Sequence, residues 1–191
     1  MRQLRGRLMR HDHAPIDPWS DSIMTTKAQQ KRPAKSKRSW AEKLADSKDL
    51  PKLARIEGKL SQRWGTGTFV IPAPLEVDAA MRQVRRGKLT TIDSIRKALA
   101  KKHRVTLACP ITTGIFAWIA AHAAEESETN GRKRVTPYWR TLKTGGELNP
   151  KYPGGIKNLR ARLTAEGHKI VAKGKRYFVA DFEPAVVEPT L

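Results

Sequence analysis

Thiol chemistry in this 191-residue chain depends on a single residue. There is one cysteine, Cys109, so the sequence predicts neither a disulfide framework nor a thiol-based zinc site. Cys109 directly precedes Pro110, which is typical of the first turn of a helix, and a helix N-terminus favours a thiolate. A lone cysteine is nevertheless usually inert, and no residue near it in sequence is typical of its base. We therefore expect no catalytic residue, no metal and no cofactor.

Positive charge is the most pronounced feature of the composition. Against 18 aspartates and glutamates stand 38 lysines and arginines, which leaves a formal net charge of +20. Nucleic-acid phosphates are the commonest partner of such a chain, because each neutralised phosphate releases a condensed counterion. A basic surface that only keeps the protein soluble is the alternative. The best candidates for phosphate contacts are two basic clusters: Lys101, Lys102 and Arg104, and Arg132, Lys133 and Arg134.

The N-terminal residues 1–38 are basic and polar, with very few large apolar side chains. Such a segment cannot offset its ordering entropy, so we expect a disordered basic tail, with translation starting at either Met1 or Met24. It has no apolar region of the kind that a secretory signal needs, and the weakly polar run 115–124 is about half as long as a bilayer span. The sequence therefore predicts a cytoplasmic, nucleoid-associated protein that does not enter a membrane.

Residues 39–72 are expected to form an N-terminal arm docked on the main domain, because they are too few for a core of their own. Ser39, followed three residues later by Glu42, predicts a capping box at the start of a short helix. A second amphipathic stretch covers residues 53–60. A glycine turn and a short strand, closed by prolines, complete the arm.

Residues 73–187 are expected to form the main domain, with residues 188–191 as a tail. Apolar residues at helical spacing predict four helices, near residues 75–84, 92–102, 111–126 and 156–166. The second and third have the proportions of a helix-turn-helix. A surface loop is expected after the third helix, from residue 125, and an extended segment over residues 135–143. Apolar runs on both sides of Lys173-Gly174-Lys175 predict a β-hairpin, which would serve as a wing.

Four features in order resemble the DNA-binding domain of the alkylguanine-DNA alkyltransferases and their alkyltransferase-like relatives. Residues 86–91 resemble the beginning of the first helix of the helix-turn-helix, and residues 110–124 take the place of the recognition helix. Pro137-Tyr138-Trp139-Arg140 falls where the family carries its Pro-Cys-His-Arg active-site motif. Stretches at 146–149, 152–155 and 163–167 follow the family's downstream order. The resemblance covers roughly residues 72–183 and implies an α+β winged helix-turn-helix domain that binds duplex DNA.

Departures from the family pattern remove its chemistry. Tyr138 stands at the position of the nucleophilic cysteine, and Trp139 at that of its histidine partner. A phenol beside an indole offers neither a low-pKa thiolate nor an adjacent base, so we expect no alkyl transfer at this motif. Alkyltransferase-like proteins also replace the cysteine, and bind lesions without repairing them. Ile92 further stands at a family tyrosine, and Gly114 at the arginine finger that fills the gap left by a flipped base.

The recognition helix is expected to have a core face and a DNA face. Large side chains should pack on the core, namely Ile111, Ile115, Trp118, Ile119 and His122. The opposite side is small and nearly uncharged, with Thr113, Gly114, Ala117, Ala121 and Ala124. Such a surface suits close approach in the minor groove, where the family uses this helix, better than direct readout in the major groove. The alternative is a helix buried on both sides, partly under the N-terminal arm.

Around this helix the sequence predicts a DNA interface and a lesion pocket. The expected interface residues are Thr112, Thr113, Gly114, Ala117, Lys101, Lys102, Arg104, Arg140 and Lys143. A salt bridge is the alternative role of Arg140. The expected lesion-pocket residues are Tyr138, Trp139, Asn149 and Tyr152. Neighbours in an extended segment point to opposite faces, so at most one of Tyr138 and Trp139 should line the pocket. Glu166 matches a relay residue of the family and is expected to be a structural hydrogen-bond acceptor.

Together these features predict a monomeric, non-enzymatic protein that binds double-stranded DNA. Alkylated or otherwise altered guanine is the target that the resemblance implies, and general DNA binding is the fallback. In a rival hypothesis, Cys109 accepts an alkyl group in place of the missing nucleophile. A third hypothesis is an RNA- or ribosome-associated protein, because positive charge does not distinguish the two nucleic acids.

Overall fold

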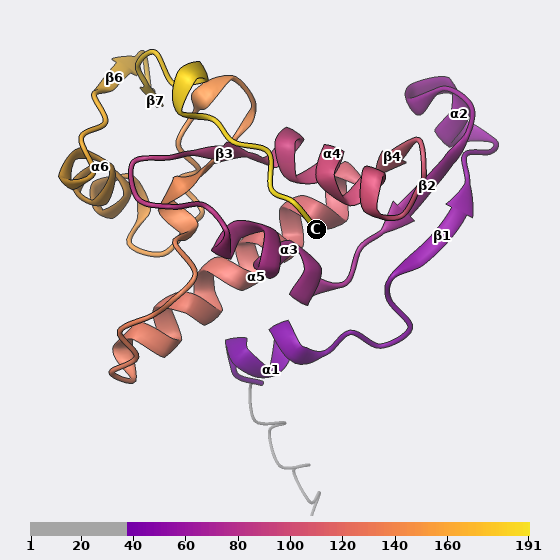
Figure 1. The fold of residues 1–191 in the computed structure, drawn as a ribbon, viewed down its shortest axis with the longest axis horizontal. Coiled ribbons are helices and arrows are strands. Elements are labelled where there is room, and N and C mark those ends of the chain that lie inside the picture. The colour runs from indigo at the N-terminus through magenta and orange to yellow at the C-terminus, as the bar shows by residue number, and fades with distance from the viewer. Residues whose placement is uncertain (1–37) are drawn as a thin grey trace, which may run out of the picture. The chain divides into compact units, whose positions relative to one another are not determined.

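A computed structural model describes residues 38–191, in which helices and short strands combine in an α+β fold, as predicted (Figure 1). The predicted disordered tail therefore lies, apart from Arg38, outside the described residues. None of the helices in the described part of the chain is long and apolar enough to cross a membrane.

Three helices that pack against one another in all three pairs form the centre of the fold, α3 (Pro74–Arg82), α4 (Ile92–Lys102) and α5 (Pro110–Thr129). Proline occupies the first turn of α3 and of α5, where its missing N–H is not needed. Thr91 caps α4, since its hydroxyl accepts a hydrogen bond of 3.0 Å from the backbone N–H of Ser94. Among the fully buried core side chains are Val77, Met81, Ile95 and Leu99.

The strands are short and belong to three small sheets. In the first, β1 (Lys52–Arg55) pairs antiparallel with β2 (Thr68–Ile71), which pairs parallel with β4 (Leu107–Ala108). In the second, β3 (Thr90–Thr91) pairs parallel with β5 (Thr141–Leu142). Because β5 directly follows the motif at 137–140 and β3 directly precedes α4, this pairing places the motif beside the start of α4.

The arm begins with the predicted capping box. The backbone N–H of Glu42 donates to Ser39 Oγ at 3.1 Å, and that of Ser39 donates to Glu42 Oε2 at 2.7 Å, which starts α1 (Trp40–Ala45). The helix α1 packs on α5, where the carboxylate of Glu126 accepts hydrogen bonds from the backbone N–H groups of Trp40 and Ala41 at 3.2 and 2.9 Å.

The stretch 53–60 is not one element. Its first residues belong to β1, because they have a strand partner in β2, and Gly58, with φ 57°, separates them from α2 (Lys59–Trp64). Long-range pairing therefore overrides the local amphipathic pattern here.

The loop expected over residues 125–134 begins later than predicted, since α5 continues to Thr129. Its glutamates are favourable in a helix and have partners: Glu126 binds α1, and Glu128 forms an ion pair of 2.6 Å with Arg162.

Beyond the motif, the chain forms α6 (Gly155–Ala165) and the hairpin of β6 (Ile170–Lys173) and β7 (Arg176–Val179). The hairpin confirms the prediction, with Ile170 opposite Val179 and Lys173 opposite Arg176. Helix α6 contacts β6, and the two lie together on the left of Figure 1. Short 3₁₀ helices cover Tyr138–Arg140, Thr144–Gly146 and Glu183–Ala185. The first of these corrects the expected extended segment.

Candidate nucleic-acid interface

The faces of α5 differ from the expected ones, although Trp118 and Ile119 pack against the core as predicted. Thr113, Ala117 and Ala121 are each 0% exposed, whereas Ile111 is 60% and Ile115 47% exposed. Small side chains let α3 approach α5 closely, so the smooth side faces the core and the large side chains on the other side remain accessible. Thr113 and Ala117 therefore cannot contact DNA, and the prediction for these two residues was wrong. The alternative, a helix buried on both sides, does not hold for the first half of α5 either, because Ile111 and Ile115 are exposed.

Gly114 differs from the other small residues of α5 because it lies at the edge of the exposed face. A Cβ added to Gly114 would have no neighbouring atom within 4 Å. Thr112, on another side of the helix, is half-buried. The helix backbone is thus accessible at Gly114, where a bulky side chain would project into open space.

The exposed side of α5 borders a pocket of about 870 Å³, lined by Ile92, Ile111, Gly114, Ile115, Trp118, His122, Lys143, Asn149, Pro150 and Lys151. Most of this lining is apolar, and the two lysines are its basic groups. The wall is partly held by a hydrogen bond of 3.0 Å from the indole Nε1 of Trp118 to the carbonyl oxygen of Lys151. The pocket therefore joins α5 to the loop 143–151, which follows the motif in the chain.

An aromatic cluster supports one end of this pocket. The ring of Trp40, from α1, stacks on His122 with centroids 4.4 Å apart and meets Trp118 edge-on at 4.8 Å. Burial in this cluster lowers the pKa of His122 below its ordinary value of 6.5, although the neighbouring Glu125 acts in the opposite direction. The arm thus holds two side chains of the pocket in place from behind.

Tyr138 is fully buried and does not line the pocket. Its hydroxyl donates to Glu125 Oε2 at 2.8 Å and accepts a hydrogen bond of 2.9 Å from Asn158 Nδ2. Burial, and next the bond to Glu125, raise the pKa of the phenol. A buried phenol held in its protonated form cannot serve as a nucleophile, and its side chain cannot touch a ligand in the pocket.

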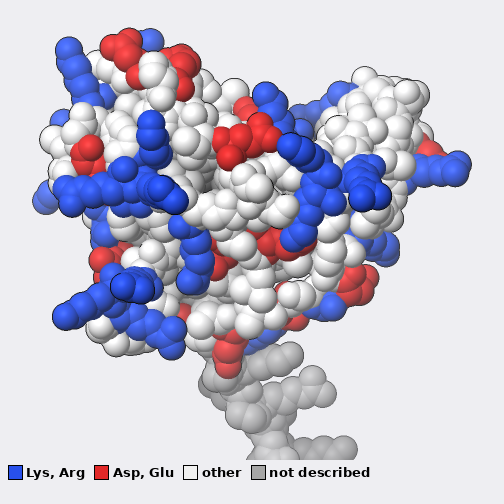
Figure 2. Space-filling model, in the orientation of Figure 1, with Lys and Arg blue, Asp and Glu red and all other residues white. Residues whose placement is uncertain are grey.

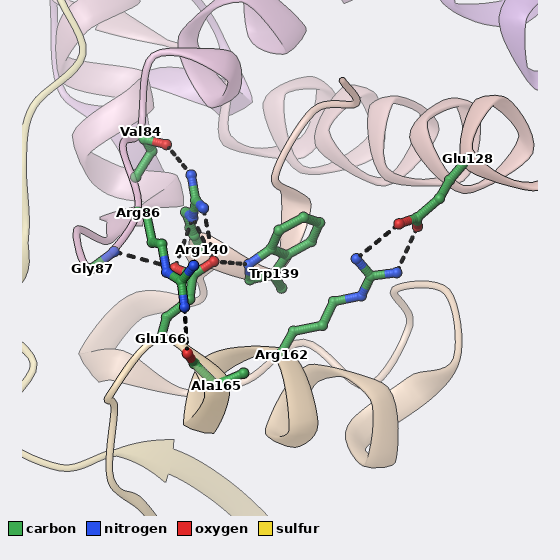
Figure 3. A network of polar contacts seen from close by, with 9 residues as sticks. All are labelled: Val84, Arg86, Gly87, Glu128, Trp139, Arg140, Arg162, Ala165 and Glu166. Atoms are coloured by element: carbon green, nitrogen blue, oxygen red, sulfur yellow. Dashed lines mark hydrogen bonds and ion pairs between the residues drawn. The ribbon is translucent and has the colours of Figure 1, made fainter. Parts of the chain in front are cut away.

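A buried carboxylate, Glu166, holds the rest of the motif (Figure 3). Its Oε1 accepts a hydrogen bond of 2.8 Å from Trp139 Nε1 and forms an ion pair of 2.7 Å with Arg140. Arg140 also donates to the carbonyl oxygen of Val84 at 2.6 Å, and the backbone N–H of Gly87 donates to Glu166 at 3.3 Å. Burial alone would raise the pKa of Glu166, but the hydrogen bonds from Arg140 and Trp139 outweigh it and lower the pKa.

This network corrects one predicted DNA contact. The side chain of Arg140 is only 13% exposed and its guanidinium is engaged by Glu166, so it is not free to reach a phosphate. The alternative role, a salt bridge, is the observed one, although it is buried rather than on the surface. The expectation that Glu166 is a structural acceptor is confirmed.

Of the predicted lesion-pocket residues, Asn149 lines the pocket, whereas Tyr138, Trp139 and Tyr152 do not. Tyr152 is 3% exposed, and the bulk of both tyrosines fills the core between the motif and α6. The lining residues that sequence reasoning missed are the large side chains of α5. The departures at Ile92 and Gly114 were the available signal, because both positions line the pocket.

The side chains predicted to contact phosphates differ in whether they already form ion pairs within the protein. Lys101 and Arg104 are exposed, while Lys102 forms an ion pair of 2.8 Å with Glu76 and Lys143 one of 2.6 Å with Glu147. On the face shown in Figure 2, lysines and arginines gather in several groups, with acidic side chains between them. Positive charge is therefore distributed over this face rather than confined to one patch.

Cys109 lies just before α5 and is 6% exposed, in a small buried cluster with Ile56 and Phe69. Within residues 38–191 no group of three or more histidine, cysteine or acidic side chains is arranged to hold a metal ion. The thiol of Cys109 is therefore shielded by the first sheet rather than presented to the pocket.

Searches against protein-family models and against curated proteins find no match for this chain. Among solved structures it is similar to the S. pombe protein Atl1 in complex with damaged DNA containing O6-carboxymethylguanine, and to S. pombe ATL in complex with DNA. The sequence identities are 17% and 18%; each match covers 61% of this chain and 94% of the other, with a TM-score of 0.44. Both matches are to alkyltransferase-like proteins and are a likeness of fold.

Proposed function

We propose that this protein binds duplex DNA without covalent chemistry, through the exposed face of α5 and the pocket beside it. The observation that carries the proposal is the pocket of about 870 Å³ between α5 and the loop 143–151. It combines apolar walls, which suit a base or an altered base, with Lys143 and Lys151, which suit neighbouring phosphates. The net charge of +20 favours the same partner.

A winged helix-turn-helix provides the docking geometry. In this proposal α4 and α5 are its two helices, and the hairpin of β6 and β7 is the wing. Lys101 and Arg104, at the end of α4, contact phosphates, and the basic tail, residues 1–38, adds further charge. The minor groove is the side of the duplex that the family resemblance implies for α5. Its exposed face carries no arginine or amide to read the major groove, which agrees with this choice.

The proposal excludes alkyl transfer at the motif and at Cys109, because neither presents a nucleophile to the pocket. Tyr138 is buried and hydrogen-bonded, and Trp139 is bound to Glu166. Cys109, the rival acceptor, is buried in the first sheet's cluster. A DNA base that enters the pocket therefore meets neither of the two candidate alkyl acceptors, the motif position and Cys109.

Altered guanine is the proposed ligand of the pocket. Two positions that the family resemblance connects with lesion handling, Ile92 and Gly114, both line it. With isoleucine and glycine there, the pocket is more apolar and more open than the family pattern implies. We therefore expect a bulky apolar substituent on the base to increase affinity.

The proposal is tested by equilibrium anisotropy with the full chain on labelled duplexes containing guanine or O6-methylguanine, with structured RNA as competitor. Duplex affinity should fall steeply with salt, and removal of residues 1–38 should make this dependence less steep. Mass spectrometry after incubation should find no methyl group on Cys109 or any other residue. Salt-independent affinity, stoichiometric methylation, or stronger binding to RNA than to DNA would each contradict the proposal.

A further inference from the structure

Two isoleucines stand exposed one helical turn apart on the first half of α5. Ile111 is 60% and Ile115 47% exposed, and both border the pocket whose apolar walls include Ile92 and Trp118. Single exposed apolar residues are ordinary on protein surfaces, but this pair continues into an apolar pocket. A continuous apolar surface of this kind indicates a binding partner rather than chance exposure.

Gly114 makes the pair project. Because a Cβ at this position would meet no atom within 4 Å, the surface next to Ile115 is hollow down to the helix backbone. Isoleucine is branched at Cβ and has a restricted χ1 angle, so each side chain is a stiff projection rather than a mobile one. Ile111 and Ile115 thus form a rigid apolar ridge, and the open space at Gly114 forms a notch beside it.

The charges around this ridge indicate which kind of partner binds it. Lys143 and Lys151 line the same pocket, and Lys151 forms no ion pair within residues 38–191. A second copy of this chain would carry the same +20 charge, so mutual repulsion opposes self-association here. A partner that suits the site offers flat apolar surfaces next to negative charge. Stacked bases between phosphates have this combination.

We infer that Ile111 and Ile115 are a wedge that enters a base step of duplex DNA and unstacks it. Apolar side chains inserted from the minor groove separate neighbouring base pairs and kink the duplex, as in other minor-groove proteins. The notch at Gly114 lets the duplex approach the helix backbone beside the wedge, and the pocket lies next to the opened step. This inference rests on the proposed function, since it assigns two side chains of the same surface a particular action on DNA.

The test uses the full chain and a duplex that carries 2-aminopurine at one central step and a fluorescent pair at its two ends. Binding should raise the 2-aminopurine fluorescence and shorten the end-to-end distance. The double variant Ile111→Ala, Ile115→Ala should lose both signals and bind about ten-fold more weakly, with an unchanged dependence on salt. The conservative double variant Ile111→Leu, Ile115→Leu should retain both signals.

A matched control is provided by two exposed leucines elsewhere, Leu53 at 54% and Leu60 at 39% exposure. The variant Leu53→Ala, Leu60→Ala should behave like the unaltered chain. If the unaltered chain fails to bind duplex DNA, the proposed function falls and the wedge with it. If it binds but the alanine pair leaves the fluorescence and distance changes intact, the wedge alone is refuted. A change of oligomeric state in the alanine variant, with unaltered DNA signals, would instead identify the ridge as a contact between copies.

Discussion

The motif at 137–140 is packed and fully bonded, whereas the first half of α5, close to it in the fold, leaves its largest apolar side chains exposed. Tyr138 is 0% exposed and both of its hydroxyl contacts are protein groups, while Ile111 is 60% exposed. The position at which the family resemblance places chemistry has thus become part of the structural core. In our proposal, ligand binding lies instead on α5 and the loop 143–151.

This difference separates stability from binding. Changes in the motif should lower the free energy of unfolding and affect DNA only through the folded fraction. Changes on the exposed face of α5 should weaken DNA binding and leave the free energy of unfolding nearly unchanged.

The largest loss of stability is expected for Arg140→Ala. It leaves the carboxylate of Glu166 buried without its cation, which typically costs about 3–5 kcal/mol. Urea unfolding measures the change. Arg176→Ala is the matched control. The side chain of Arg176 is 67% exposed, and the long ion pair of 3.5 Å that it forms with Glu147 contributes at most about 1 kcal/mol to stability. Equal losses for the two variants would contradict the structural role of the motif.

The two sides of α5 should differ when one leucine is added to each. Ala117→Leu overpacks the buried side and should cost about 1–3 kcal/mol of unfolding free energy. Gly114→Leu adds its side chain to open space and should leave stability unchanged or raise it by up to about 1 kcal/mol, since leucine favours a helix over glycine. Thermal melting of both variants measures these two changes in stability. A loss for Gly114→Leu as large as that for Ala117→Leu would show that both sides are buried.

A smaller effect is expected for Tyr138→Phe, which keeps the ring and removes the hydroxyl. The bonds to Glu125 and Asn158 are lost, at a cost of roughly 1 kcal/mol because Glu125 can regain water. Tyr177→Phe is the control, as that hydroxyl makes no hydrogen bond within the described residues. DNA affinity should not change in either variant. Weaker DNA binding by fully folded Tyr138→Phe would indicate that Tyr138 belongs to the binding site.

The smallest effect is a dependence of stability on pH through His122. Burial holds its pKa below 6.5 in the folded chain, so the unfolded chain takes up the proton first as the pH falls. The stability associated with neutral His122 is therefore complete above pH 6.5 and declines below it. His122→Phe preserves the stack on Trp40 and should flatten the decline between pH 7 and 5 in urea unfolding. An identical pH profile for both chains would rule out this contribution.

Local signals in the sequence predicted much of the fold. The capping box at Ser39, the cap at Thr91 and the hairpin across Gly174 each depend on residues a few positions apart, and each is observed. The role of Glu166 as an acceptor was also predictable, because the family's histidine partner is absent and a buried carboxylate needs donors.

The orientation of α5 was not predictable from side-chain size. Large apolar residues usually face the core, but here alanines and Thr113 face it because α3 approaches closely on that side. Likewise, β1 depends on β2 as a partner, and the burial of Arg140 depends on Glu166, which lies 26 positions later. Such contacts are absent from any local pattern. The pocket as a whole therefore could not be predicted, although Ile92, Gly114, Lys143 and Asn149 among its residues had been singled out.

Duplex affinity of Gly114→Leu, measured by fluorescence anisotropy at fixed salt, tests most directly that the exposed face of α5 binds DNA. Ala79→Leu, at an exposed alanine of α3, is the matched control. Leucine at Gly114 would block close approach to the helix and narrow the pocket, so affinity should fall about ten-fold or more while the control binds normally. An unchanged affinity of folded Gly114→Leu would show that DNA, if bound, is bound by another surface.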